Sequence, residues 1–393
     1  MTDNSKYFEK YTLNNNVEVP GRLVIPPLTL FSSNPDGTLS EGERKYLELR
    51  ATGVGLYILG ACAINQEGIA FPFQPRAFSE KDIESNAERA KIIKSQGALA
   101  INQIHHGGAL SKKEYSGLTP VAPSADIANE KLEKSGQLTD ETKIRELTDE
   151  EIKKTIEDFA YATEISIKAG YDGIEIHGAN NYLIQQFYSP YTNRRTDDWG
   201  GSVEKRMNFP LKIVDACCKV REKFNKPEFI IGYRLSPEEP FEPGITMTET
   251  KQLIKALVEK PIQYIHISLK KFFQTTRRGE GTGIERLKVI HELTKGKVAL
   301  IGVGGLKTQQ DFTEAINSGL TEFVAAGVAS MMNRDLGILL KENKGDKLEL
   351  ALDPEHPEKY AYSKTLWDLC LSDHGFDFFP PIKGKPIIKK GEF

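Results

Sequence analysis

The sequence lacks three features that mark whole classes of protein: a cysteine framework, a long apolar run and a surplus of charge of one sign. Its 393 residues hold four cysteines, Cys62, Cys217, Cys218 and Cys370. None of them forms a C-x-x-C pair, which argues against a zinc ribbon or a cysteine-ligated iron–sulfur cluster. Lys and Arg total 52 against 55 Asp and Glu, and the net charge of −3 gives no electrostatic case for binding nucleic acid.

Membrane and secretion signals are missing as well. No stretch of eighteen apolar residues occurs, and the first residues, MTDNSKYFEK, contain no apolar signal region. We therefore expect no membrane association and a cytoplasmic, reduced setting. With 39% hydrophobic and 27% charged residues, the composition is that of a soluble globular protein.

The sequence does contain a regular alternation of short β-like runs with helical patterns. The runs are residues 22–30, 54–64, 98–106, 172–178, 228–236, 264–269, 298–305 and 322–328. Between the third and fourth runs, for example, Thr148 and Gly170 predict the two ends of one helix. Parallel strands need such crossovers, and eight of them close a barrel, so we expect a (β/α)8 TIM barrel, with a doubly wound sheet as the alternative.

The spacing of the runs predicts additions to the barrel. The third connection is about forty residues longer than a standard unit, and the surplus, residues 107–147, predicts a lid over the barrel mouth. Residues after about 345 have no strand left to supply, so we divide the chain into a barrel at 1–345 and a C-terminal extension at 346–393. Near the start, YTLNNNVEVPGR predicts a hairpin that turns at residues 14–16 and closes the barrel floor.

Polar residues and glycines gather where the runs end, which in a barrel is the face that carries the chemistry. Glycines end the last two runs, where backbone N–H groups commonly bind phosphate. No metal-ligand set appears, because His177 has no acidic or histidine partner at a suitable spacing. No G-x-G-x-x-G occurs either, since Lys307 stands where its last glycine should be, so a Rossmann-bound dinucleotide is not expected.

One long stretch makes the chain resemble a known family. HGANNYLIQQFYSPYTNRRTDDWGGSVEKR, residues 177–206, is similar to the signature of the old yellow enzyme family of FMN-dependent NAD(P)H oxidoreductases. The resemblance runs from PPLT in the first run through NQIHHGG, GYRLS and IGVGG to about Asp335, which is nearly the whole barrel. It implies a TIM barrel that binds FMN and takes hydride from NADH or NADPH.

The resemblance assigns six residues to the flavin ring. They are Pro27, Leu28, Thr29, Ala61, Gln103 and Arg234. The Thr29 hydroxyl would donate to the flavin O4, and Gln103 offers both a donor and an acceptor to the N3–H/C2=O edge. Arg234 would place a permanent cation near N1 and C2=O, where the reduced ring concentrates negative charge.

The phosphate of FMN is assigned to Gly304, Gly305, Gly327 and Val328, and here the chain departs from the family. Many members carry an arginine on the phosphate where this chain has Val328, and an arginine after H-x-G where this chain has Ala109. Losing a charge-assisted contact costs on the order of 2 kcal/mol unless another group replaces it. The replacements available in the sequence are Arg334, Lys307, Lys270 and Lys271.

The remaining family residues act on the substrate. By resemblance, His177 and Asn180 donate two hydrogen bonds to one carbonyl oxygen and draw electrons from a conjugated C=C bond. Tyr182 then protonates the α carbon after hydride has reached the β carbon. Hence the expected activity is transfer of hydride from NAD(P)H to an α,β-unsaturated carbonyl or similar small-molecule acceptor.

Two other functions stay open at this point. A lysine at the end of the sixth run, Lys270 or Lys271, stands where a Schiff-base lyase would carry its nucleophile. The chain could also bind flavin without catalysis.

Several nearby residues are expected to have structural roles. In a strand His105 and His106 point to opposite faces, and His106 aligns with the family histidine and is expected to support the site from behind. Arg194, Arg195, Asp197 and Asp198 are expected to pin their loop by ion pairs. In the tail, Phe376, Phe378 and Phe379 should dock either on the chain's own barrel or on a second subunit of a homo-oligomer.

Overall fold

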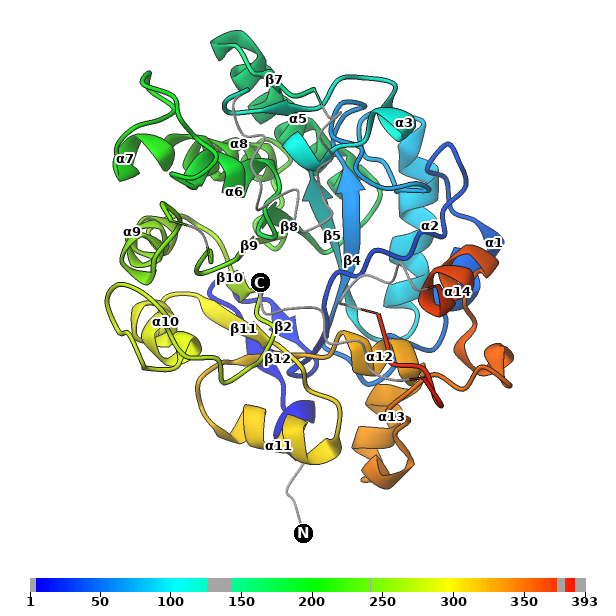
Figure 1. The fold of residues 1–393 in the computed structure, drawn as a ribbon. Helices are drawn as coiled ribbons and strands as arrows, with labels where there is room; N and C mark the ends of the chain where they lie inside the picture. Colours follow the sequence, from blue (N-terminus) through cyan, green and yellow to red (C-terminus); the bar gives the residue numbers. More distant parts are fainter. Residues whose placement is uncertain (1–4, 126–142, 241, 373–378, 386–393) are drawn as a thin grey trace.

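A computed structural model describes residues 5–125, 143–240, 242–372 and 379–385, and in these ranges eight parallel strands form a closed barrel (Figure 1). In barrel order they are β3 (Leu23–Ile25), β4 (Leu56–Ala63), β5 (Leu99–His105), β8 (Gly173–Gly178), β9 (Ile230–Leu235), β10 (Tyr264–Ile267), β11 (Ala299–Val303) and β12 (Phe323–Ala325). Pairing of β12 with β3 closes the ring. The predicted barrel is therefore confirmed, each strand lying inside its predicted run, and the doubly wound sheet is wrong.

Helices connect consecutive strands and surround the barrel in Figure 1. They are α1 (Glu41–Leu47), α2 (Asp82–Lys94), α5 (Asp149–Lys168), α8 (Asn208–Lys223), α9 (Met247–Leu257), α10 (Arg286–Thr294) and α11 (Gln309–Asn317). The predicted start of α5 is confirmed: the Thr148 hydroxyl accepts the Glu151 N–H at 3.3 Å, and the Glu151 carboxylate accepts the Thr148 N–H at 2.8 Å. Such a capping box stabilises a helix by about 1 kcal/mol.

The inside of the barrel changes from apolar at the floor to polar at the mouth. Twelve buried residues form the floor cluster: Leu13, Val19, Val24, Leu56, Ile58, Ile101, Ile230, Tyr264, Ala299, Ile301, Phe323 and Ala325. A strand alternates its faces, so residues two and four positions further along point inward too, at the mouth. The predicted hairpin of β1 (Tyr11–Thr12) and β2 (Glu18–Val19) covers the floor, where Asn14 Nδ2 donates to the carbonyls of Ile262 and Lys297 at 2.8 and 3.0 Å.

The third connection carries short elements of its own. They are η2 (Gly108–Leu110), α3 (Lys113–Ser116), β6 (Val121–Ala122) and β7 (Arg145–Glu146), and β6 and β7 pair in parallel. The middle of the expected lid, residues 126–142, lies outside the described residues. After β8 come two further short helices, α6 (Leu183–Tyr188) and α7 (Val203–Arg206).

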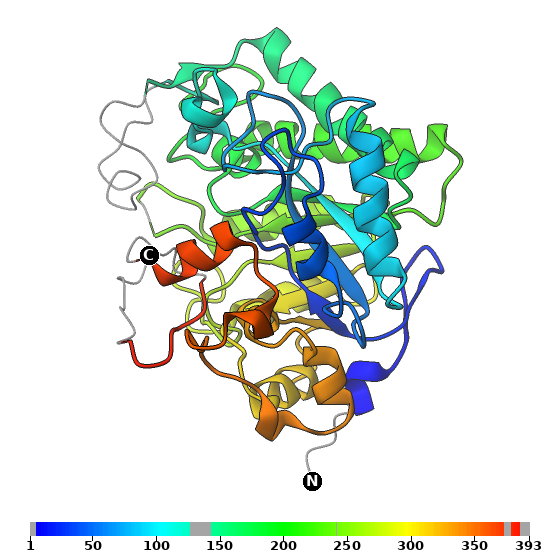
Figure 2. The same ribbon diagram turned by 90° about the vertical axis from the view of Figure 1, so that its right-hand side faces the viewer.

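The chain after β12 returns to the segment that follows β3. It contains α12 (Val328–Met332), α13 (Leu336–Lys341), η3 (Gly345–Lys347), η4 (Pro357–Tyr360) and α14 (Lys364–Leu371), and α14 lies beside α1 in Figures 1 and 2. The Ser363 and Ser32 hydroxyls are hydrogen-bonded at 2.7 Å. Phe379 contacts Phe31 edge-on with ring centroids 6.2 Å apart, so this part of the tail docks on its own chain. Phe376 and Phe378 lie outside the described residues.

The remaining element is η1 (Ser5–Phe8). No helix in the described ranges combines the length and the apolar character that a membrane span requires.

Candidate active site

The end of β3 and a bulge in β4 form one wall of the barrel mouth. Pro27, Leu28 and Thr29 follow β3 directly, and β4 shifts its register against β5 at Gly60 and Ala61. Ala61 has a φ of 36°, and a Cβ on Gly60 would lie only 2.2 Å from the Leu28 carbonyl oxygen. Among the described residues the Thr29 hydroxyl makes no hydrogen bond. This wall presents backbone groups and one uncommitted hydroxyl, which suits the edge of a flavin ring.

Gln103 and Glu175 make a buried polar layer just below the mouth. The Gln103 carbonyl accepts the Ala61 N–H at 3.3 Å, and its amide donates to Glu175 Oε1 at 2.7 Å. His266 Nδ1 lies 2.9 Å from Glu175 Oε2 and donates to it, since a carboxylate only accepts. Burial alone would raise the pKa of Glu175, but His266, Arg234 and the Gln103 hydrogen bond lower it, so the carboxylate is ionised.

Arg234 is the cation that faces this carboxylate. Its side chain is buried, with the residue 8% exposed, and Nη2 donates to Ser268 Oγ at 3.2 Å. Its Nε is buried and has no partner among the described residues. A buried guanidinium N–H without an acceptor is costly, so the site fits a ligand with an electron-rich acceptor at this position, as the flavin N1/C2=O edge is.

His177 presents one N–H donor to the mouth. Its Nδ1 lies 3.3 Å from the backbone N of Ala179, and because that N–H can only donate, Nδ1 accepts. Burial, followed by the charges around it, lowers the pKa of His177 well below 6.5, so the imidazole is neutral and carries its proton on Nε2. No partner for Nε2 lies within the described residues, and this proton is available to a ligand.

Asn180 stands beside it on a strained turn. Asn180 and Asn181 have φ angles of 58° and 61°, in the left-handed region that asparagine tolerates better than most residues. The Asn180 backbone N–H donates to Ser236 Oγ at 2.9 Å, and Ser268 Oγ lies 2.8 Å from Asn180 Oδ1. The residue is exposed at the mouth, so its amide is open to a ligand.

Tyr182 completes the group of donors. It directly precedes α6, and its ring meets those of His105, His177 and Phe71 edge-on, with centroids 4.3, 5.0 and 6.0 Å apart. Burial raises the pKa of the phenol well above its ordinary value, which keeps it protonated at working pH. The Tyr182 ring, with a protonated phenol, thus lies beside that of His177, as the predicted proton donor requires.

His105 belongs to this group, although the sequence did not single it out. Its ring lies 5.3 Å from that of His177 and faces the mouth, whereas His106 points the other way and its Nδ1 accepts the Gly108 N–H at 3.0 Å. His106 thus sits behind the site, as expected. The same alternation that puts His105 and His106 on opposite faces also puts His105 on the inward face of Gln103, two residues before it, and that second step was the one missed. Glu175 and His266 carry the same signal.

The structure separates the residues that could replace the missing phosphate arginine into those near the strand-end glycines and those far from them. Gly304 and Gly305 have φ angles of 151° and 66°, and a Cβ on Gly304 would lie 2.6 Å from the Lys271 carbonyl carbon. The loop that carries Lys270 and Lys271 therefore lies against these glycines. Arg334 instead lies near the charges of Arg50 and Glu48, at the end of α1 opposite the mouth. The contact of Gly327 and Val328 with the phosphate stays a prediction.

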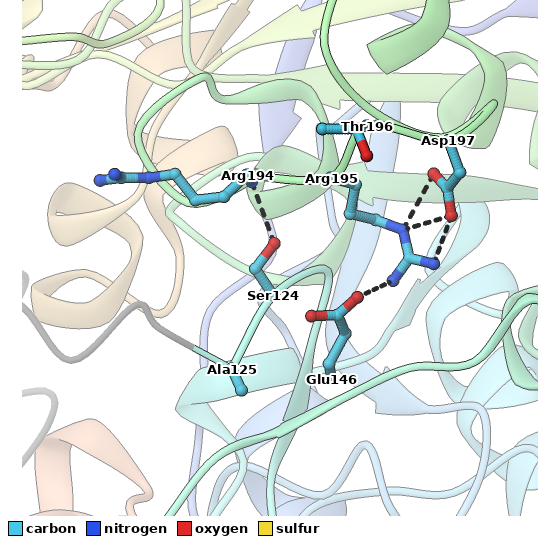
Figure 3. A pocket seen from close by; sticks show the side chains of 7 residues that line it. All are labelled: Ser124, Ala125, Glu146, Arg194, Arg195, Thr196 and Asp197. Atoms are coloured by element: carbon cyan, nitrogen blue, oxygen red, sulfur yellow. Dashed lines mark hydrogen bonds and ion pairs between the residues drawn. The ribbon is translucent and has the colours of Figure 1, made fainter.

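The predicted structural role of the loop after α6 agrees with its contacts. Arg195 bonds Asp197, Glu146 and the carbonyls of Pro123 and Leu147, which joins both ends of the lid segment to this loop. Figure 3 shows Arg195 between the two carboxylates, with the Arg194 side chain pointing away. A pocket of about 350 Å³ lies here, lined by Ser124, Ala125, Glu146, Arg194, Arg195, Thr196 and Asp197.

Other candidate chemistry finds little support in the described ranges. Lys270 and Lys271 are exposed, so neither occupies the buried pocket that would activate a Schiff-base lysine. No group of three or more His, Cys, Asp or Glu side chains there could hold a metal ion. All four cysteines are buried.

Comparison with known proteins gives a consistent result. The sequence model of the NADH:flavin oxidoreductase / NADH oxidase family matches residues 6–347. The probable NADH-dependent flavin oxidoreductase YqiG of Bacillus subtilis (strain 168) is 39% identical over 376 residues, which are 95% of this chain and 98% of that protein. The crystal structure of an old yellow enzyme homologue from Zymomonas mobilis superimposes with a TM-score of 0.75 at 25% identity, covering 91% of this chain and 99% of that one.

Two further relatives are much longer than this chain. The NADH:fumarate oxidoreductase of Klebsiella pneumoniae (strain 342) is 35% identical, and the match covers 94% of this chain but 39% of that protein. For the NADH:acrylate oxidoreductase of Vibrio harveyi, the identity is 34% and the shares are 79% and 31%. This chain therefore corresponds to one part of each of them.

Proposed function

Because this chain belongs to the NADH:flavin oxidoreductase / NADH oxidase family, we propose that its barrel mouth uses FMN to pass hydride from NADH to a double bond conjugated with oxygen. One observation carries the choice of site: His177, Asn180 and Tyr182 present three donors at one mouth, next to the buried cation of Arg234. Neither Schiff-base chemistry nor passive flavin binding gives this set of residues a joint purpose.

The flavin-facing residues would hold the cofactor and stabilise its reduced, negatively charged form. When bound, FMN accepts a hydride from NADH and returns it to the β carbon of the acceptor. Arg234 supplies fixed positive charge where the reduced ring is negative, and Thr29 supplies a hydroxyl donor on the opposite wall. The backbone of Pro27, Leu28 and Ala61 would line the ring edge.

The substrate-facing residues would polarise the acceptor and finish the reaction. His177 Nε2–H and the Asn180 amide donate to the same oxygen, which lowers the energy of negative charge arriving there. Tyr182 gives its phenolic proton to the α carbon, so the acceptor gains one hydride and one proton across its double bond. A proton from water then restores the phenol.

The acceptor class follows from the two hydrogen-bond donors on His177 and Asn180, which we call the clamp. Two donors that face one position suit an oxygen with free lone pairs, as in an enone, a nitroalkene or an α,β-unsaturated carboxylate. The names of the fumarate and acrylate oxidoreductases agree with the last class, and this chain matches 39% and 31% of those proteins.

Colour and half-reactions test this function. The purified protein should be yellow and release FMN on denaturation. NADH should bleach it without oxygen, and an enone such as 2-cyclohexenone, or acrylate, should restore the colour. Running NADPH in parallel settles the reductant. A yellow protein that NADH and NADPH both fail to bleach would be a non-catalytic flavin carrier. A colourless protein that takes up no FMN would refute the flavin-dependent function. Borohydride trapping of a carbonyl substrate on Lys270 or Lys271 would then show that the protein is a Schiff-base lyase.

Several features remain predictions alongside this proposal. They are the cytoplasmic location, a homo-oligomeric state, the absence of nucleic-acid partners, the lid role of residues 107–147 and the division of the chain at residue 345.

A further inference from the structure

Ser268 connects the two halves of the site. It follows β10 and lies at the barrel mouth, two residues beyond His266 and so on the same inward face. Its hydroxyl lies 3.2 Å from Arg234 Nη2 on one side and 2.8 Å from Asn180 Oδ1 on the other. One small side chain thus touches both the flavin-facing cation and the substrate-facing amide.

The chemistry of arginine fixes the direction of the first of these two hydrogen bonds. A guanidinium has donors only, so the Ser268 oxygen must accept from Arg234. The single hydroxyl hydrogen of Ser268 is then left to donate, and it points to Asn180. The Ser268 hydroxyl donates to the Asn180 carbonyl oxygen, Oδ1, at 2.8 Å, which places the NH2 group on the opposite side of the planar amide.

Ser236 strengthens the same arrangement from the end of β9. Its Oγ accepts the Asn180 backbone N–H at 2.9 Å and lies 3.5 Å from Asn180 Oδ1. The Asn180 amide oxygen is thus flanked by two serine hydroxyls, whereas its NH2 group has no partner within the described residues. A free asparagine would present either end of its amide to a ligand.

We propose that Ser268 is a positioning residue that holds the Asn180 amide with its NH2 group toward the substrate and links that orientation to Arg234. The inference rests on the proposed role of Asn180 in the acceptor clamp. Because only the NH2 end then faces the site, the clamp selects ligands that present an oxygen acceptor, and it discriminates against those that present a donor.

Ligand titration of the FMN-loaded enzyme tests the proposal without turnover. A phenolate such as that of 4-hydroxybenzaldehyde should bind over the flavin and produce a long-wavelength charge-transfer band. Ser268→Ala should weaken this binding about 3- to 10-fold, the effect of one lost hydrogen bond, with unchanged FMN content. Ser268→Thr, which keeps the hydroxyl, should restore most of the affinity. Ser166→Ala, which removes a buried hydroxyl bonded to Asn102 far from Asn180, is the matched control and should bind normally.

A double-mutant cycle distinguishes positioning from a merely local effect. If Ser268 acts through Asn180, adding Ser268→Ala to Asn180→Gly, which keeps the left-handed turn, should change the dissociation constant less than 2-fold. An equal weakening in both backgrounds, or none in the wild-type background, would overturn the proposal. Should Ser268→Ala fail to fold, Ser268→Cys replaces it, since a thiol is a poor donor of similar size. A wild-type enzyme that binds FMN but no phenol would instead overturn the clamp itself, and with it this role of Ser268.

Discussion

Removing one oxygen atom from Tyr182 should separate the two halves of the catalytic cycle. In Tyr182→Phe the ring stays, and with it the edge contacts to His105, His177 and Phe71 at 4.3, 5.0 and 6.0 Å. Packing and acceptor binding should therefore change little. Only the proton donor is lost, and general acid catalysis contributes roughly 10²-fold or more, or about 2.7 kcal/mol of activation free energy.

Anaerobic stopped-flow spectroscopy measures the two halves separately. Bleaching of the flavin by NADH needs no proton from Tyr182 and should keep its wild-type rate. Return of the colour with 2-cyclohexenone should slow by roughly 10²-fold or more. His106→Phe is a useful control, because His106 lies behind the site and should alter neither half selectively.

The pH dependence gives a second, independent reading. Burial raises the pKa of Tyr182 above its ordinary value, so the wild-type phenol stays protonated and reoxidation should be level from about pH 6 to 9. In Tyr182→Phe the proton must come from solvent, and reoxidation should fall as pH rises. Equal slowing of both halves, or a level pH profile in the variant, would show that Tyr182 is a wall of the pocket and not the acid.

Further predictions concern the clamp, the histidines and the tail. Changing His177 and Asn180 together to Ala should weaken phenol binding by about 2–4 kcal/mol, since two donors are lost; retained affinity would place the clamp elsewhere. Burial lowers the pKa values of His105 and His106 in the folded protein to about 3. Below pH 6.5 the unfolded chain therefore binds more protons than the folded protein, and the free energy of unfolding falls as the pH falls. Each histidine adds at most about 1.4 kcal/mol per pH unit to the slope of the free energy of unfolding against pH. A melting temperature that does not change between pH 7 and 4.5 would contradict this prediction. Deleting residues 376–393 should leave the mass by light scattering and the flavin content unchanged, because the described part of the tail packs on its own chain; a drop in mass would put the tail in a subunit interface.

The barrel could be predicted because its signals are local. Each run is rich in apolar residues and forms a strand that is almost entirely buried, and helix ends such as Thr148 are marked by capping residues. The ends of the strands can also be predicted from these runs, which puts Gln103, His177 and Arg234 at one end of the barrel. Their proximity in the structure follows from parallel strands that end at the same edge.

What the sequence did not yield depends on contacts between distant segments. Gln103 bonds Glu175 on β8, and Arg234 bonds Ser268 just after β10. Nothing in the spacing of the sequence indicates these two pairs. Docking of Phe379 on Phe31 joins residues more than three hundred positions apart, so composition alone left its partner open between the same chain and a second subunit.

The left-handed turn at Asn180 has a consequence for anyone who would redesign the acceptor range of this enzyme. At a φ of 58°, the backbone conformation itself is sterically unfavourable for most residue types, and it is most unfavourable for β-branched residues. In a saturation library at this position, most variants will therefore distort the turn, whatever their side chain could offer to an acceptor. Gly, Asp and His should keep the turn best, and of these only His brings a donor. Diversity for new acceptors is better placed on neighbours with ordinary backbone angles.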